Sequence, residues 1–299
     1  MELATSEVMM RDVPDLYRTL RYDCAVFKEI HNTYSGEDHR WERTLERMGS
    51  DEGAPPRGVE LDLHQSEKNP YEWCVTHTGD YNDSPDDCLR RYFDDLSEWS
   101  KAYPEHDPIH VLLDLKSSRG SGAVLAKDLD PYILKSFDRK QLYTPADLCE
   151  RGKGSMREVA TTFGWPFVSE LFGRFIFSLS GDDDKKKLQY AKTTPSARLC
   201  FADQAYFTTP KAPPRDTDQI VVNCEYFDGP TVGKALEWVV HRPGLLTRGF
   251  YVDNPERWDS ARKAAINMIA LEEVDDAQRV GDDDLPFGFV VREDLPDPR

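Results

Sequence analysis

The stretch Ile109-His110-Val111-Leu112-Leu113-Asp114-Leu115-Lys116 is an apolar run that ends in charged residues. The stretch Gly58-Val59-Glu60-Leu61-Asp62 repeats this pattern, and two more apolar runs end at His31-Asn32 and at His77. Short aliphatic or β-branched runs bounded by loops are typical of buried strands. In a parallel barrel the carboxyl ends of all strands lie on one rim, so these polar residues would converge on one pocket.

Strand and helix patterns alternate along the rest of the chain. Further strand candidates lie at residues 174–179, 197–202, 219–223, 248–252 and 267–271. Apolar spacing predicts helices at residues 1–20, 39–48, 89–99, within 123–171, at 232–240 and at 255–265. No helix fits between the second and third strands, because residues 65–71 are too few and too polar.

This alternation predicts an α/β fold, a TIM-type (β/α)8 barrel that is distorted where the helix between its second and third strands is missing. Nine strand candidates compete for the eight places of such a barrel, and we assign residues 219–223 as the accessory or false one. No linker divides the chain, so residues 1–299 are predicted to form a single domain.

Composition favours a globular protein in a reducing compartment. Hydrophobic residues make up 39% of the chain and charged residues 31%, which is enough apolar material for a core. The sequence shows no leader and no transmembrane segment, and its six cysteines contain no CxxC pair. We therefore expect a cytoplasmic protein with reduced thiols; a secreted protein whose leader is missing from the sequence would look the same.

The net charge of −17 argues against a nucleic-acid partner, because phosphate backbones are held by lysine and arginine clusters. It also argues against stable binding to anionic membranes. The acidic runs at residues 80–87, 182–184 and 272–284 are interpreted as solvated surface, as are Arg157 and the basic run at residues 185–187.

Two imidazoles follow predicted strands and could act as acid and base. Because an imidazole titrates near neutrality, His31 could take a proton from an attacking hydroxyl and His77 could give one to a leaving oxygen. The two roles could equally be reversed. Either histidine alone would more often be structural, so the hypothesis depends on the pair.

Oxygen donors stand beside both histidines at the predicted rim. Calcium prefers oxygen ligands, with magnesium as the alternative, and the candidates are Asn32, Glu60, Asp62 and Asp114. Lys116 shares a strand face with Asp114 and could hold a phosphoryl oxygen. The other interpretation is a set of solvated or salt-bridged charges. Taken together, the residues suit metal-assisted attack on a phosphodiester.

The order of these motifs resembles the calcium-dependent phosphatidylinositol-specific phospholipase C family, in the superfamily of phospholipase-C-like phosphodiesterases. The resemblance covers residues 24–118 and rests on His31-Asn32-Thr33-Tyr34, Gly58-Val59-Glu60-Leu61-Asp62, Val75-Thr76-His77 and Leu112-Leu113-Asp114-Leu115-Lys116. It implies a barrel with His31 as general base and His77 as general acid. It also implies calcium held by Asn32, Glu60, Asp62 and Asp114, and attack by a hydroxyl of the substrate to give a cyclic phosphate.

Several substrates and activities remain open at this point. The Asp114 to Lys116 element is also similar to the phospholipase D toxins that cleave sphingomyelin, which use magnesium. A glycerophosphodiesterase would release a linear phosphomonoester, and a non-catalytic barrel would only bind a phosphorylated ligand or partner. The expected partner is a lipid or small-molecule phosphodiester.

Overall fold

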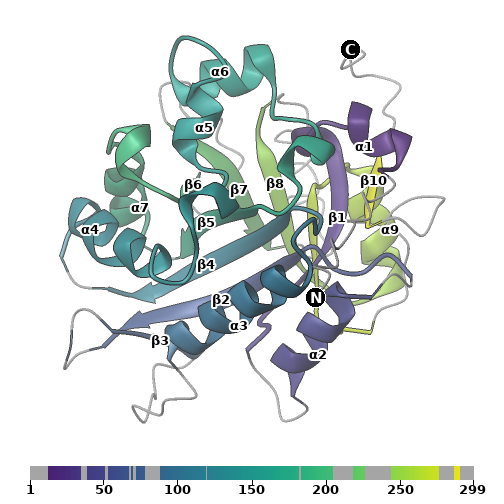
Figure 1. Ribbon diagram of the computed structural model, residues 1–299, viewed down its shortest axis with the longest axis horizontal. Coiled ribbons are helices and arrows are strands. Elements are labelled where there is room, and N and C mark those ends of the chain that lie inside the picture. Colours follow the sequence, from purple (N-terminus) through teal and green to yellow (C-terminus); the bar gives the residue numbers. More distant parts are fainter. Residues whose placement is uncertain are drawn as a thin grey trace, which may run out of the picture.

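Eight parallel strands close into a barrel in this computed structural model (Figure 1). The structure describes residues 13–34, 39–50, 53–66, 69, 72–77, 88–118, 120–181, 183–204, 218–225, 244–275 and 286–289. The barrel strands are β1 (Ala25–Ile30), β2 (Gly58–Gln65), β4 (Ile109–Ser117), β5 (Phe175–Gly181), β6 (Phe201–Gln204), β7 (Gln219–Glu225), β8 (Leu246–Val252) and β9 (Met268–Leu271). Because β1 pairs in parallel with both β9 and β2, the sheet closes and the predicted TIM-type barrel is confirmed.

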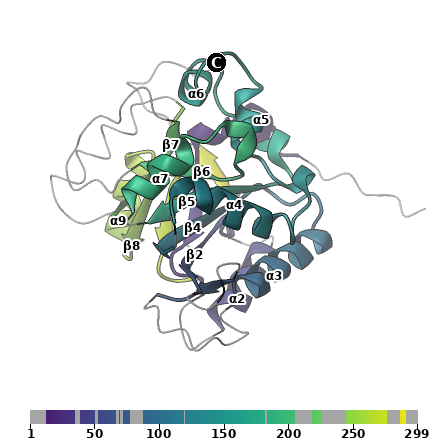
Figure 2. The same cartoon turned by 90° about the vertical axis from the view of Figure 1, so that its left-hand side faces the viewer.

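Helices surround the strands on the outer face of the barrel (Figure 2). They are α1 (Asp15–Thr19), α2 (Arg40–Met48), α3 (Leu89–Ala102), α4 (Gly122–Ile133), α5 (Pro145–Cys149), α6 (Met156–Phe163), α7 (Asp184–Ala191) and α9 (Pro255–Lys263). The predictions at residues 39–48, 89–99 and 255–265 are confirmed. Only α1 is described within residues 1–20, and residues 232–240 lie outside the described part. None of the described helices is long and apolar enough to cross a membrane.

One strand outside the parallel barrel is β3 (Trp73–Val75), which runs antiparallel to β2. The assignment of residues 219–223 as accessory is therefore wrong, because they form β7, which lies between β6 and β8. A parallel return to the sheet needs a long crossover, and without a helix after β2 the chain turns back as a hairpin. A short strand that was not predicted, β10 (Phe287–Phe289), pairs antiparallel with β1.

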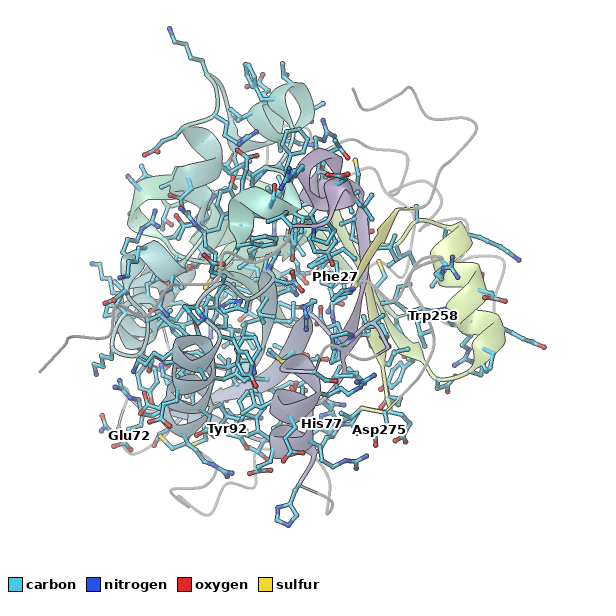
Figure 3. The ribbon with its side chains drawn as sticks, turned by 45° about the vertical axis from the view of Figure 1, so that its right-hand side comes forward. Phe27, Glu72, His77, Tyr92, Trp258 and Asp275 are labelled. Atoms are coloured by element: carbon cyan, nitrogen blue, oxygen red, sulfur yellow. The ribbon has the colours of Figure 1, made fainter. Side chains whose placement is uncertain are left out.

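Apolar packing fills the space between strands and helices in two clusters. Tyr92 and Phe93 of α3 belong to one cluster, and Phe93 packs edge-on against Phe177 of β5 with ring centroids 5.6 Å apart. Phe27 of β1 and Trp258 of α9 belong to the other cluster. Figure 3 shows Tyr92 and Trp258 on different sides of the molecule. Burial of this apolar surface is the main term that stabilises the closed barrel.

The barrel also encloses charged side chains, and a glycine makes room for one of them. Glu29 of β1 and His110 of β4 are each 0% exposed. A Cβ atom at Gly58 would lie 2.6 Å from Cγ of Glu29, so a larger residue there would displace that carboxylate. Glycine is therefore required as the first residue of β2, because the Glu29 side chain of β1 occupies the space beside it.

Candidate active site

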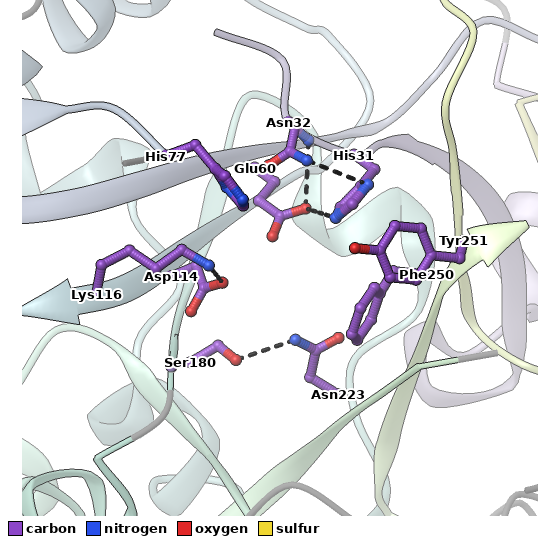
Figure 4. Close-up of a pocket in the computed structure, with 11 residues that line it drawn as sticks. His31, Asn32, Glu60, His77, Asp114, Lys116, Ser180, Asn223, Phe250 and Tyr251 are labelled. Carbon is purple, nitrogen blue, oxygen red and sulfur yellow. Dashed lines mark hydrogen bonds and ion pairs between the residues drawn. The ribbon is translucent and has the colours of Figure 1, made fainter. Parts of the chain in front are cut away.

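A pocket opens at the carboxyl ends of the barrel strands (Figure 4). Its lining comes from β2, β4, β5, β7 and β8 and from the segments after β1 and β3: His31, Asn32, Glu60, His77, Asp114, Lys116, Ser180, Gly181, Asn223, Phe250 and Tyr251. Asp62 is 0% exposed and contacts both His77 and Lys116. The structure therefore brings all seven predicted site residues together.

His31 is buried and held by a carboxylate that the sequence analysis missed. Its Nδ1 lies 2.5 Å from Oε1 of Glu272, which follows β9 directly, and its Nε2 lies 3.6 Å from Oε2 of Glu60. The imidazole also stacks on Phe250, with ring centroids 5.4 Å apart. Burial would raise the pKa of Glu272, but the hydrogen bond and charge of His31 outweigh it and hold that pKa below its usual value.

Glu272 corrects the interpretation of residues 272–284 as solvated surface. A signal was available, because Glu272 stands at the end of a predicted strand as the other site residues do. The acidic residues that follow Glu272 mask this signal, because they give the segment the composition of a solvated loop. We call the contact between the two side chains the His31–Glu272 dyad.

His77 reaches the pocket because β3 is antiparallel. The Thr76 N–H donates to the Asp62 carbonyl at 3.1 Å, which brings the end of β3 beside the middle of β2. The Nδ1 atom of His77 lies 2.9 Å from Oδ2 of Asp62, while 61% of its side chain is exposed. His77 and Asp275 lie at the same end of the molecule (Figure 3). The site thus contains a second imidazole–carboxylate pair, open to solvent.

Three carboxylates form a cluster that fits a hard cation. Glu60, Asp62 and Asp114 each offer one oxygen, and these oxygens lie within 4.8 Å of one another. Among the described residues, the buried Oδ1 of Asp62 has no hydrogen-bond partner, which is costly unless a cation or water occupies the site. An all-oxygen donor set is the one that Ca²⁺ and Mg²⁺ prefer.

Lys116 lies among these carboxylates. Its Nζ is 2.7 Å from Oδ2 of Asp114 and 3.1 Å from Oδ2 of Asp62. Burial would lower the pKa of Lys116, but the two carboxylates outweigh it and raise that pKa, so the ammonium stays charged. The ammonium group of Lys116 therefore neutralises part of the negative charge of the carboxylate cluster.

A fully buried guanidinium forms an ion pair with Glu60 inside the barrel. Arg248 of β8 donates to Oε2 of Glu60 at 2.6 Å, to Oε1 of Glu29 at 2.6 Å and to Oδ1 of Asn223 at 2.9 Å. His110 contacts the other oxygen of Glu29 at 2.9 Å. Burial raises the pKa of Glu60, and the charge of Arg248 opposes that rise.

Two basic side chains interpreted as solvated are buried instead. Lys187 is 1% exposed, and its Nζ lies 2.6 Å from Oδ1 of Asp203, because α7 turns this residue toward β6. The other oxygen of Asp203 accepts from Ser180 at 2.6 Å, and Asn223 donates to Ser180 at 3.0 Å. Arg157 is 8% exposed. A continuous polar network therefore runs from Lys187 of α7 to Arg248 of β8, and it passes through Ser180 and Asn223, which line the pocket.

An α/β barrel with two imidazoles and a carboxylate cluster at its rim is the arrangement that the resemblance noted in the sequence implies. Residues 73–219 match the family model described as phosphoinositide phospholipase C, Ca²⁺-dependent. This match confirms the resemblance seen in the sequence to the Ca²⁺-dependent phosphoinositide phospholipase C family. The matched region includes His77, Asp114 and Lys116, whereas His31, Asn32, Glu60 and Asp62 precede it. No curated protein matches the chain.

Solved structures show the same fold. A calcium-dependent phosphoinositol-specific phospholipase C from Pseudomonas sp. is 19% identical with a TM-score of 0.72, and the alignment covers 93% of this chain and 98% of that one. The Ca²⁺-dependent enzyme from Streptomyces antibioticus is 18% identical, with a TM-score of 0.67 and coverage of 87% and 97%. A glycerophosphodiester phosphodiesterase from Parabacteroides distasonis is more distant, at 13% identity, a TM-score of 0.51 and coverage of 84% and 94%.

Proposed function

We propose that this protein cleaves a phosphoinositide or a related glycerophosphodiester, with Ca²⁺, by attack of a substrate hydroxyl on phosphorus that gives a cyclic phosphate. One observation carries the proposal: two imidazoles, each with Nδ1 against a carboxylate, line one pocket together with the oxygen cluster. A nucleophile within the substrate needs a base, an acid and a centre of positive charge.

His31 is the proposed general base. With the Nδ1 proton shared with Glu272, Nε2 keeps the lone pair that accepts the proton of the attacking hydroxyl. The nearby carboxylates of Glu272 and Glu60 would stabilise the imidazolium that forms. The stacked ring of Phe250 restricts rotation of the imidazole.

His77 is the proposed general acid. Its Nδ1 contact with Asp62 leaves Nε2 to give a proton to the leaving oxygen. Because most of its side chain is exposed, it stands where a leaving group departs into solvent. A lipid or a soluble glycerol group is compatible with that position.

The residues that would hold Ca²⁺ are Asn32, Glu60, Asp62 and Asp114, with Mg²⁺ as the alternative ion. When bound, the cation would neutralise charge that develops on the phosphoryl oxygens. Asp62 would use Oδ1, since Oδ2 contacts His77 and Lys116. Lys116 would add a second positive charge for a phosphoryl oxygen.

Phosphorus NMR tests this proposal directly. The purified protein is incubated with glycerophosphoinositol and with phosphatidylinositol, first with Ca²⁺ and then with a chelator. We expect a cyclic phosphate that forms only with Ca²⁺ and is absent with the His31→Ala variant. A linear phosphomonoester without a cyclic intermediate would indicate a glycerophosphodiesterase instead. Calcium binding without turnover of either substrate would favour a binding protein.

A further inference from the structure

A single guanidinium ties together the two backbone segments that carry the His31–Glu272 dyad. Nη2 of Arg40, the first residue of α2, donates to the carbonyl of His31 at 3.0 Å and to the carbonyl of Glu272. We propose that Arg40 is a positioning residue that holds these strand ends so that the two side chains meet. This inference rests on the proposed function, in which His31 takes a proton.

The dyad lies just beyond the regular pairing of β1 and β9. The parallel ladder ends at Ile30 and Leu271, and the His31 N–H donates to the Leu271 carbonyl at 2.9 Å. After His31 the chain leaves the strand, since Asn32 has a left-handed backbone with φ of 49°. Past this point the carbonyls of His31 and Glu272 lie beyond the ladder between β1 and β9, and Arg40 supplies a donor to both.

Charge makes Arg40 suited to this task. Hydrogen bonds from an ionised donor are stronger than those between neutral groups. Among the described residues, Nε of Arg40 is buried without a hydrogen-bond partner, so the hold on the two segments comes from Nη2. Misplacement of a catalytic group by about 1 Å can cost up to about 100-fold in rate, and the 2.5 Å contact of the dyad leaves little room for such a shift.

The same helix provides a matched control. Arg43 lies one turn further along α2 and pairs with Asp275, three residues after Glu272. Both partners of that pair are exposed, at 39% and 68%. Arg43→Met therefore removes an arginine that links α2 to the same segment without touching the dyad.

The test compares Arg40→Met, Arg40→Lys and Arg43→Met. For Arg40→Met we expect kcat to fall by about tenfold or more, while KM and the Kd for Ca²⁺, measured by calorimetry, change by less than about twofold. Arg40→Lys should restore part of kcat because an ammonium can donate to the same carbonyls. Arg43→Met should leave kcat unchanged. Equal losses in the Arg40→Met and Arg43→Met variants would overturn the inference.

A double-mutant cycle asks whether Arg40 acts through the dyad. In a Glu272→Gln background, Arg40→Met should reduce kcat by less than about twofold further, because the contact it supports is already weakened. The same factor in both backgrounds would mean that Arg40 acts elsewhere.

Proton NMR provides a readout that does not need turnover. The low-field signal of the proton between His31 and Glu272, assigned by its loss in His31→Ala, should broaden or disappear in Arg40→Met and persist in Arg43→Met. If the wild-type protein cleaves no diester, the proposed function fails, whereas this comparison still decides whether Arg40 holds the dyad. A signal unchanged in Arg40→Met would refute the positioning role.

Discussion

Burial separates the two histidines and predicts that they respond differently to the leaving group. The His31 side chain is 6% exposed and that of His77 is 61% exposed. Loss of either proposed general catalyst should cost about 100- to 10,000-fold in kcat with a natural substrate. With an inositol phosphodiester of p-nitrophenol, which leaves without protonation, His77→Ala should recover most of this loss and His31→Ala should not. Absorbance of the released phenolate gives both rates, and rescue of His31→Ala alone would reverse the two roles.

Arg248 is expected to matter for stability more than any surface arginine. Arg248→Met would leave Glu29 and Glu60 buried without their shared guanidinium, which should reduce the free energy of unfolding by about 3–5 kcal/mol. Urea unfolding with a chelator present measures the loss. Arg90→Met is the control, because its exposed pair with Asp94 should contribute less than about 1 kcal/mol. Equal effects would show that the interior pair is not required.

At the scale of elements, α4 and α7 are joined by a carboxylate that makes stability depend on pH. Asp130 of α4 accepts from the Tyr190 hydroxyl of α7 at 2.8 Å and from the Leu199 N–H at 2.9 Å. Burial raises the pKa of Asp130 to about 7, well above its ordinary value near 3.9. The folded state therefore keeps a proton that the unfolded chain loses.

The sign of this effect follows from linkage. Between about pH 4 and pH 7 the folded protein binds more protons at Asp130 than the unfolded chain, so this residue's contribution to stability falls as pH rises. The total change is up to about 4 kcal/mol, and it is flat above about pH 7. The free energy of unfolding, measured in urea between about pH 4 and pH 7, should fall with rising pH in the wild type. The Asp130→Asn variant should lack this part of the pH dependence. Parallel curves from pH 4 to pH 8 would contradict it.

Most strands could be predicted because each carries a local apolar run. The direction in which a strand runs could not be predicted in every case. The direction of β3 depends on a connection too short for a crossover, so a run that resembles a barrel strand pairs antiparallel instead. β10 has only three residues, Phe287–Phe289. It forms because β1 pairs with β2 at Ile30 alone, which leaves the beginning of β1 with an edge for β10.

The same distinction between local and distant information explains the site. Glu60 and Asp114 stand at ends of apolar runs and were predicted from that position. Arg248 opens a predicted run and lies inside β8 in the structure, and its contact with Glu29 joins residues 219 positions apart. Glu272 follows a run as the others do, yet its inward orientation depends on His31, which is 241 positions away. Residues so far apart in the chain cannot be paired from a local sequence pattern.

For the whole molecule, a net charge of −17 makes cation binding a stabilising event. Ca²⁺ that binds only the folded state should raise the free energy of unfolding by about 2.7 kcal/mol at about 100 times its Kd. Thermal unfolding in Ca²⁺, in Mg²⁺ and in NaCl of equal ionic strength separates site binding from general screening. The Asp62→Asn/Asp114→Asn variant should lose the Ca²⁺ increment and keep the salt effect. An increment retained in that variant would place the bound calcium elsewhere.

The pairing of β1 with β9 brings the two ends of the barrel sequence together, and the His31–Glu272 dyad sits directly on that junction. Contacts of such long sequence separation are slow to form, because much of the chain must be ordered before they close. During synthesis His31 emerges early, but its carboxylate partner leaves the ribosome only after the rest of the barrel. The proposed base therefore gains its carboxylate partner only when β9 has paired with β1, and turnover would report closure of the barrel.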